Sequence, residues 1–399
     1  MSSLNAVLEL GTSNTVLAIG EMQQDGRVKI ITHCRIPSVG VRKSKIINLE
    51  QVKKSIGSVL RESEKLQLKA GSKITLGNAF LIMSGTHVRT SPLVGTATIA
   101  RQKVTDAEIT EAQRSLRSFG LPPGREVIDI YEQGYDLDGI GGIDDPKGMS
   151  GSVLKVHALL VDADADRIND ARSAADSENL ELRDPLFSVM CAADAVLEER
   201  DRIDGSIVID CGGGTTGYAV FLNGQVVTAG TIGVGGDHIT NDIAYAFQTT
   251  QSQAEALKIE EASALPTVMQ GASARVKMPG DSPLVESRTI SRKALNTVTN
   301  ARLRELLTIL REKLSDLDLL HRLHAGAILV GGGAKMRDLP QLVTQTLGTV
   351  TRIGVPLYVD GLENEPDPER LAAVAGALMY VQRNYEEKSI FDFFKGIFK

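Results

Sequence analysis

Cysteine is scarce in this chain of 399 residues, and long apolar runs are missing from it. The three cysteines have no paired spacing, so no disulfide framework or zinc site follows, and a reducing cytoplasm fits their use. No stretch approaches the length of apolar residues that spans a bilayer. The N-terminal residues reach the acidic Glu9 without the basic and then apolar pattern of a secretory signal. The cysteines are Cys34, Cys191 and Cys211.

Positive charge is also in deficit, because the net charge at pH 7 is -6. This balance argues against a general nucleic-acid binder, although a local basic patch is compatible with it. His321 and His324 have a spacing that could bind a metal, but a partly exposed helical pair is the simpler interpretation. The 42% hydrophobic and 24% charged content is that of a globular protein, and the length allows two sizeable α/β domains.

A glycine-rich turn between two apolar strands occupies residues 207–221. Its glycines would let backbone N–H groups approach an anion closely, and Asp210 could hold a hydrated metal ion beside that anion. Asn223-Gly224 predicts a type I′ hairpin turn after the second strand. Walker and dinucleotide motifs are excluded, because both open a helix rather than a strand. Taken alone, the pattern also fits an ordinary glycine-rich hairpin corner.

The same pattern occurs near the N-terminus, where residues 7–19 repeat it with Glu9 as the acidic residue. A third glycine turn follows the apolar run 328–330. An internal duplication is hard to obtain by chance, and two phosphate hairpins predict a cleft that clamps a nucleoside triphosphate. The candidate nucleotide-binding residues in the three turns are Gly11, Thr12, Ser13, Asn14, Gly212, Gly213, Gly214, Thr215, Thr216, Gly331, Gly332, Gly333 and Ala334.

These motifs resemble those of the actin, sugar-kinase and heat-shock-chaperone ATPase superfamily. Within it, the chain resembles the bacterial cell-division protein FtsA over nearly its whole length, most closely at residues 210–216, 235–244, 330–334 and the C-terminal tip. The resemblance implies an α/β, actin-like, two-domain ATPase fold with a duplicated core and an FtsA-type insert subdomain called 1C. ATP and Mg²⁺ are the ligands that it implies.

The resemblance also divides the chain into subdomains. Cap residues support the expected helices at Asn48 (about 49–65), Thr105 (about 106–119) and Ser291 (to about 320). The expected boundaries are 1–81 for subdomain 1A with the first phosphate hairpin, 82–161 for 1C, 162–204 for the return to 1A, 205–236 for 2A with the second hairpin, 237–324 for 2B, 325–360 for the rest of 2A, 361–381 for the last helix of 1A, 382–388 for a short linker and 389–399 for an amphipathic helix.

Catalytic roles follow from the same resemblance. Glu9 and Asp210 are expected to hold Mg²⁺ through water, and both are candidate catalytic residues. Asp184 stands where the superfamily has a Glu-Pro or a Gln that starts a connecting helix and positions the attacking water; a plain helix N-cap is the alternative. The family has an aspartate at two positions where this chain has Glu9 and Gly217. These two departures predict that ATPase activity is weak or absent.

Further nucleotide contacts are expected in the second half of the chain. Gly235 and Gly236 precede a helix, and a helix N-terminus after glycines is a natural anion site. Glu255 and Lys258 match the family's Ala-Glu-x-Leu-Lys helix and are candidates for ribose and base contacts. The basic segment from Arg42 to Lys45 fits either a solvated face or a phosphate contact.

The chain ends in an aromatic, amphipathic stretch that follows the hydrophilic residues 382–388. At about 100° per residue, its apolar side chains fall within an arc of roughly 160°, with the polar ones opposite. This density of phenylalanine favours an interfacial membrane anchor over a buried terminal helix. The linker that the family usually has is nearly absent, so a polymer would sit close to the bilayer. The expected membrane contacts are Ile390, Phe391, Phe393, Phe394, Lys395, Ile397, Phe398 and Lys399.

Together these features predict an ATP-binding, actin-like protein that polymerises on the cytoplasmic face of the inner membrane at the division septum. The resemblance implies binding of the C-terminal peptide of FtsZ to 2B, and of other division proteins to 1C. Two alternatives remain open. One is a small-molecule kinase of the same superfamily, which needs a catalytic aspartate and leaves the tip unexplained. The other is a pilus- or magnetosome-type actin-like adaptor.

Overall fold

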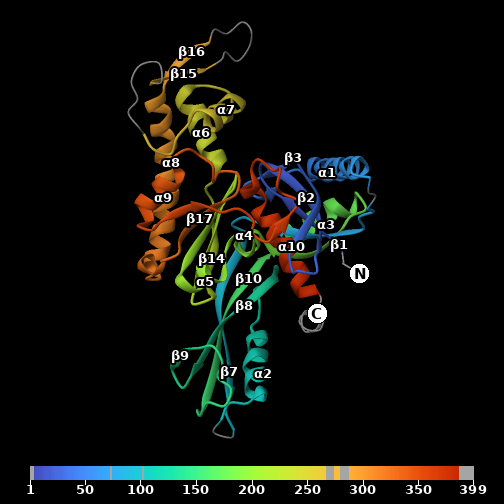
Figure 1. The fold of residues 1–399 in the computed structure, drawn as a ribbon, viewed down its shortest axis with the longest axis vertical. Coiled ribbons are helices and arrows are strands. Elements are labelled where there is room, and N and C mark those ends of the chain that lie inside the picture. The colour runs from blue at the N-terminus through green and yellow to red at the C-terminus, as the bar shows by residue number, and fades with distance from the viewer. Residues whose placement is uncertain (1–3, 72–73, 101–102, 267–273, 279–286, 386–399) are drawn as a thin grey trace.

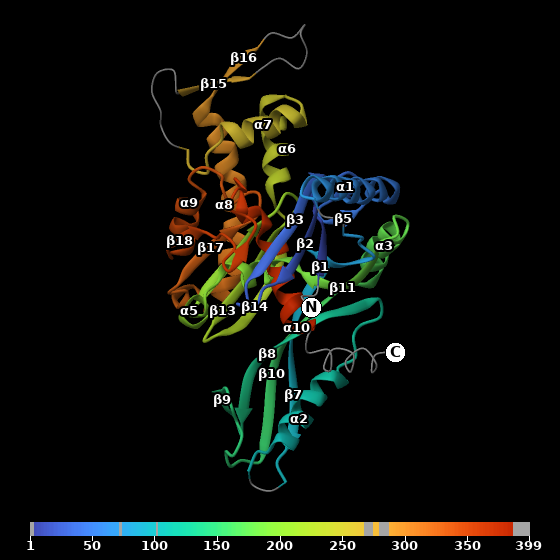
Figure 2. The ribbon, with the colours of Figure 1, turned by 45° about the vertical axis from the view of Figure 1, so that its right-hand side comes forward.

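The computed structural model describes residues 4–71, 74–100, 103–266, 274–278 and 287–385 (Figure 1). The tip at 389–399 lies outside these residues. Two core sheets stand side by side, and a third sheet projects from them (Figures 1 and 2). No helix in the described part of the chain is both long enough and apolar enough to cross a bilayer.

The first core sheet has the strand order β11-β6-β1-β2-β3-β19. Strands β1, β2 and β3 form an antiparallel meander at its centre. Strands β6, β11 and β19 pair in parallel with their neighbours. Helices cover both faces: the Cys34 thiol on β3 donates to Val59 O of α1, whereas Gly20 on β2 faces Leu378 of α10 (Figure 2). The strands are β1 (Leu4–Leu10), β2 (Asn14–Met22), β3 (Val28–Pro37), β6 (Asn78–Met83), β11 (Glu181–Phe187) and β19 (Val359–Asp360), and the helices of this domain are α1 (Leu49–Lys69), α3 (Ala165–Asp176), α4 (Ser188–Val196) and α10 (Ala372–Tyr385).

The second core sheet repeats the arrangement of the first. Its order β14-β13-β12-β17-β18 matches β3-β2-β1-β6-β11, with the same antiparallel meander and the same parallel neighbours. This equivalence confirms the predicted duplication. The strands are β12 (Ser206–Cys211), β13 (Thr216–Leu222), β14 (Gln225–Ile232), β17 (Gly326–Val330) and β18 (Thr351–Ile353), with α5 (Glu199–Asp204) before them and α9 (Leu339–Leu347) after β17.

A helical unit above the second sheet carries the ribbon β15–β16 at its far end (Figure 1). The long helix α8 begins at the cap Ser291, whose side chain accepts a bond from the Ala294 N–H, as predicted, and ends at Asp316, before the expected 320. The elements are α6 (Gly236–Phe247), α7 (Gln251–Glu260), β15 (Arg275–Met278), β16 (Arg288–Ser291), α8 (Arg292–Asp316) and the 3₁₀ turn η3 (Leu320–Arg322).

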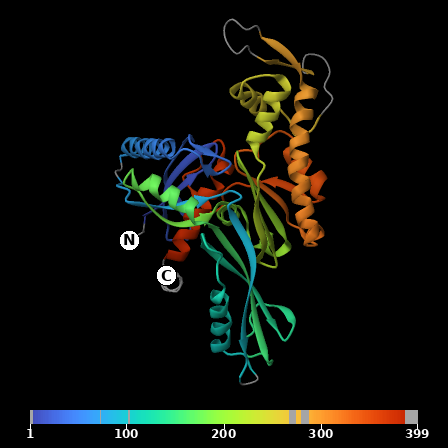
Figure 3. The same ribbon diagram turned by 180° about the vertical axis from the view of Figure 1, so that it is seen from behind.

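The projecting unit is a four-stranded sheet, β7-β10-β8-β9, with one helix alongside (Figure 3). It has its own apolar core, which includes Leu93, Leu154 and Val156. Thr105 caps its helix with a reciprocal bond to Glu108, as predicted, but the α-helix ends at Ser115 and a 3₁₀ turn follows. The elements are β7 (Val88–Thr98), α2 (Asp106–Ser115), η1 (Leu116–Ser118), β8 (Arg125–Leu137), β9 (Ile140–Ile143) and β10 (Val153–Asp164).

Helices α4 and α10 together join the two core domains, because α10 packs on the first sheet and α4 packs on both α10 and the second sheet. Small residues allow a very close approach between them: a Cβ on Gly376 would lie 1.6 Å from Cys191 O. The segment before α10 is only partly exposed to solvent, and its last turn contains buried residues. Glu369 is only 1% exposed, because the 3₁₀ turn η4 (Pro368–Leu371) lies against the third glycine turn, where the Gly331 N–H donates to Glu369 O.

Candidate functional site

Two turns of matching geometry connect β1 to β2 and β12 to β13. A Cβ on Gly11 would lie 2.7 Å from Asn14 O, and a Cβ on Gly212 would lie 2.7 Å from Thr215 O. Real Cβ atoms do not approach a carbonyl oxygen this closely, so both turns require glycine at the first position. The hairpin after the second turn has Asn223 and Gly224 at φ 52 and 81, which is the predicted type I′ conformation.

The two turns face each other across the domain boundary. A Cβ on Gly213 would lie 2.0 Å from Ser13 Oγ, and one on Gly214 would lie 2.4 Å from Thr12 Oγ1. A cavity of about 290 Å³ opens between them and continues into the second domain. The predicted residues that line it are Glu9, Gly11, Thr12, Ser13, Asn14, Asp210, Gly212, Gly213, Gly214, Thr215, Thr216, Gly235, Gly236, Glu255, Lys258, Gly331, Gly332 and Gly333.

A small hairpin, β4 (Val41–Arg42) with β5 (Lys45–Ile46), reaches the point where the turns meet. The Ser44 N–H donates to Thr12 Oγ1 at 2.8 Å, and Ser44 Oγ lies 3.3 Å from Thr215 Oγ1. Lys43 and Ser44 both have positive φ, which a two-residue type I′ turn requires. Ser44 lines the cavity, whereas Arg42, Lys43 and Lys45 are not among the lining residues, so a phosphate contact of the basic side chains stays a prediction. Sequence reasoning missed Ser44, because Lys-Ser is not a recognised hairpin signal.

The two acidic residues lie one position before the ends of equivalent strands, and both line the cavity. Burial, and then the negative charge of Asp210, raise the pKa of Glu9 to about 8. Burial also raises the pKa of Asp210, while a hydrogen bond from Ser188 opposes this shift. Two carboxylates that repel each other beside phosphate-binding turns form a donor set of hard oxygens. This chemistry fits a hydrated Mg²⁺ ion.

Glu9 makes the stability of the ligand-free protein depend on pH. Its pKa is raised above the ordinary 4.5, so its stabilising contribution is complete below that value and is lost as pH rises through about 8. We expect the melting temperature of the wild type to fall relative to that of Glu9→Gln between about pH 6 and about pH 9, by roughly 1–3 °C. Thermal unfolding without nucleotide or Mg²⁺ measures this. Parallel pH profiles of the two proteins would contradict it.

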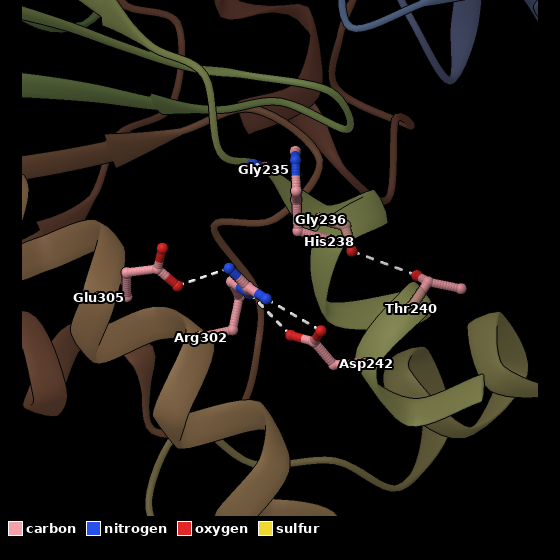
Figure 4. A network of polar contacts seen from close by, with 7 residues as sticks. All are labelled: Gly235, Gly236, His238, Thr240, Asp242, Arg302 and Glu305. Atoms are coloured by element: carbon pink, nitrogen blue, oxygen red, sulfur yellow. Dashed lines mark hydrogen bonds and ion pairs between the residues drawn. The ribbon is translucent and has the colours of Figure 1, made fainter. Parts of the chain in front are cut away.

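The helix N-terminus of α6 forms the next wall of the cavity. The Gly236 and Asp237 N–H groups donate into the second phosphate turn, to Gly212 O and Gly213 O. The Gly235 N–H donates to His238 Nδ1 at 3.1 Å, which fixes the entry to the helix (Figure 4). These bonds join the N-terminus of α6 to the phosphate turn as one unit, and they use the N–H groups of Gly235, Gly236 and Asp237 within the protein.

Polar side chains from α7 and α8 also line the cavity. Lys258 Nζ lies 2.6 Å from Glu255 Oε2 and donates to Thr240 Oγ1 at 3.0 Å, so the two predicted base contacts pair with each other. Arg302, which sequence reasoning missed, also lines the cavity. It makes a two-point contact with Asp242 at 2.7 and 2.9 Å and pairs with Glu305 (Figure 4).

Apolar side chains form another part of the cavity wall, a feature that the sequence pattern of these helices did not reveal. They come from α8, α9 and the turn before α9, so only their packing brings them together. A pocket that is polar at one end and apolar at the other suits a phosphorylated ligand with a planar base. The residues are Leu303, Leu306, Leu307, Met336, Leu339 and Val343.

Two predicted site residues are not among those that line the cavity. Asp184 lies on β11, which pairs with β6 as far as Phe187, and α4 begins only at Ser188. The interpretation of Asp184 as a helix N-cap is therefore wrong, because the first residue of the helix is Ser188. Ala334 is fully buried in the core of the second domain beside the glycine turn.

Comparison with known proteins agrees with this architecture. A family model described as "Cell division protein FtsA" matches residues 207–376, and one described as "SHS2 domain inserted in FTSA" matches residues 85–162. The cell division protein FtsA of Pseudomonas aeruginosa is 31% identical over 375 residues, which are 94% of this chain and 88% of the relative.

Solved structures support the fold at lower identity. A chain of a PilM–PilN type IV pilus biogenesis complex superimposes with a TM-score of 0.66 at 16% identity, over 94% of this chain and 98% of that one. MreB5 of Spiroplasma citri bound to ADP gives 0.55 at 15% identity, over 96% and 98%. The fold is therefore the actin-like α/β fold. With the sequence identity over nearly its whole length, this chain belongs to the FtsA family of bacterial cell division proteins.

Proposed function

We propose that this chain binds ATP with Mg²⁺ between its two core domains and polymerises on the cytoplasmic face of the inner membrane, where it tethers the FtsZ ring at the division septum. The observation that carries the proposal is the pair of equivalent glycine turns that face each other across one cavity. Glu9 and Asp210, which both line it, supply the carboxylates that would hold the hydrated metal ion, whose charge would offset that of the phosphates.

Nucleotide binding in this proposal sets the angle between the domains. The turns belong to different domains, so phosphates held by both would favour the closed arrangement over an open one. A likeness in fold to MreB5, which was solved with ADP, supports a nucleotide in this cavity. Closure then fixes the shape of the subunit that assembles into filaments. Because Glu9 is longer than the family's aspartate, hydrolysis is expected to be slow or absent and to act only as a timer.

Membrane attachment in this proposal rests on the sequence of the tip, which lies outside the described residues. One short amphipathic helix binds lipid weakly, but a filament presents many copies at once and converts weak contacts into firm attachment. The C-terminal peptide of FtsZ is proposed to bind subdomain 2B, where Tyr245 on α6 is 89% exposed. Other division proteins are proposed to bind the insert. Titration of a fluorescent FtsZ peptide with the purified chain tests the first of these contacts.

The decisive experiment is co-sedimentation with vesicles that contain anionic lipid, in the presence of ATP and Mg²⁺, with negative-stain imaging. We expect the full chain to form filaments on vesicles and a chain that ends at Lys388 to lose at least about 10-fold in vesicle binding, because the tip supplies the buried apolar area. Phe119→Asp is a matched control, since it removes an exposed phenylalanine of the insert.

Three results would count against the proposal. Equal vesicle binding by the shortened chain would remove the tip as the anchor. Filaments without ATP would separate assembly from the nucleotide. Transfer of phosphate from ATP to a small molecule, with no filaments from either chain, would favour a kinase of the same superfamily.

A further inference from the structure

Asp210 is supported from behind by a side chain that does not reach the cavity. Ser188, the first residue of α4, is 1% exposed, and its hydroxyl donates to Asp210 Oδ2 at 2.9 Å. The other carboxylate oxygen lies against the third glycine turn, where a Cβ on Gly331 would be 2.5 Å from Oδ1. The carboxylate is therefore held on two sides, and one of the two contacts is a directional hydrogen bond to a charged group.

Directly across the sheet from Asp210 stands Gly217. A Cβ on Gly217 would lie 3.0 Å from the Cβ of Val189 and 3.5 Å from that of Asp210. The backbone of Gly217 is not in the left-handed region. Space, and not backbone conformation, is therefore the reason for glycine at this position.

Two consecutive residues of α4 thus fill the space beside Gly217 and place a polar group beside Asp210. Val189 occupies the space beside Gly217, and this close packing brings the Ser188 hydroxyl to Asp210. An aspartate at 217 would instead place a second negative charge directly opposite Asp210, and like charges at such a pair are destabilising. The chain has a neutral hydrogen-bond donor in that neighbourhood in place of an acid.

We propose that Ser188 is a positioning residue that orients the Asp210 carboxylate toward the hydrated metal ion, and that the contact between Val189 and Gly217 is what allows it to do so. This assignment rests on the proposed binding of ATP with Mg²⁺. Ser188 acts through Asp210 and touches neither nucleotide nor metal. Its bond to Oδ2 restrains the rotation of the carboxylate and leaves the remaining lone pairs available to water on the cation.

The test is the affinity for ATP measured by calorimetry with Mg²⁺ and with EDTA. Mg²⁺ is expected to increase the affinity of the wild type for ATP, and this increase should be about 10-fold smaller in Ser188→Ala. The affinity measured in EDTA should change little. The reason is that the variant loses one hydrogen bond to a charged group. Ser188→Thr keeps the hydroxyl and should retain the gain. Ser58→Ala, which removes a hydroxyl bound to Lys54 O on the surface of α1, is the control.

Different outcomes would contradict the role of Ser188 and the proposed binding of ATP. A full Mg²⁺ gain in Ser188→Ala, or an equal loss with and without Mg²⁺, would overturn the positioning role. Absence of ATP binding by the wild type would overturn the proposed function itself and this assignment with it. The packing is tested independently by thermal unfolding: Gly217→Asp should lower the melting temperature, and adding Val189→Ala should restore part of it. No recovery in the double variant would contradict the role given to Val189.

Discussion

Gly376→Ala is expected to destabilise the protein by roughly 3–5 kcal/mol, enough to abolish most folded protein at growth temperature. Alanine normally favours a helix over glycine by about 1 kcal/mol, so helix propensity alone predicts the opposite sign. Packing decides the outcome, because the new methyl group would lie 1.6 Å from Cys191 O on α4. A backbone carbonyl cannot move away without separating two helices that join both domains. Urea unfolding followed by circular dichroism measures the loss.

Gly57→Ala is the matched control, since it also adds a methyl group inside a helix. Its Cβ would meet the carboxyl end of Glu178, a flexible side chain that can turn aside. We expect a change within about 0.5 kcal/mol there. If Gly376→Ala proved as stable as Gly57→Ala, the close contact between α4 and α10 would not exist in solution.

Gly235→Ala is expected to reduce the affinity for ATP at least about 100-fold while leaving the fold intact. A Cβ at this position would lie 2.6 Å from Gly213 O, 2.6 Å from Thr215 N and 2.7 Å from Gly212 O. All three are backbone atoms of the second phosphate turn. The turn must therefore move away from the N-terminus of α6, which breaks the bonds from Gly236 and Asp237 that hold the phosphate turn in place.

Gly233→Ala controls for this change within the same loop. Its Cβ would meet only Thr86 Cγ2, at an ordinary 3.4 Å. Calorimetry should show wild-type ATP affinity for this control. Tight ATP binding by Gly235→Ala would show that the phosphate turn does not depend on its contact with α6.

The duplicated hairpins and most helix starts could be predicted from the sequence because short-range chemistry specifies them. The conformation of a glycine turn between apolar strands depends only on the residues of the turn. A helix cap is also local: the Asn48 side chain accepts a bond from the N–H of Gln51, three positions later. The failure at Asp184 has the opposite cause. The resemblance to the superfamily's Glu-Pro suggested a helix start at Asp184, whereas pairing with β6 keeps the chain extended to Phe187. Pro185 is compatible with this placement because β11 is an edge strand.

By itself, the sequence of this protein determined the two phosphate turns, the acidic residue beside each of them and the resemblance that they carry. Only the tertiary structure decided which distant side chains complete the site. Ser44 reaches Thr12 and Thr215 through a hairpin without a sequence signal, and Ser188 reaches Asp210 because α4 packs against a glycine. The physical reason is range: local patterns govern turns and caps, whereas contacts between residues far apart in the chain depend on how whole elements pack.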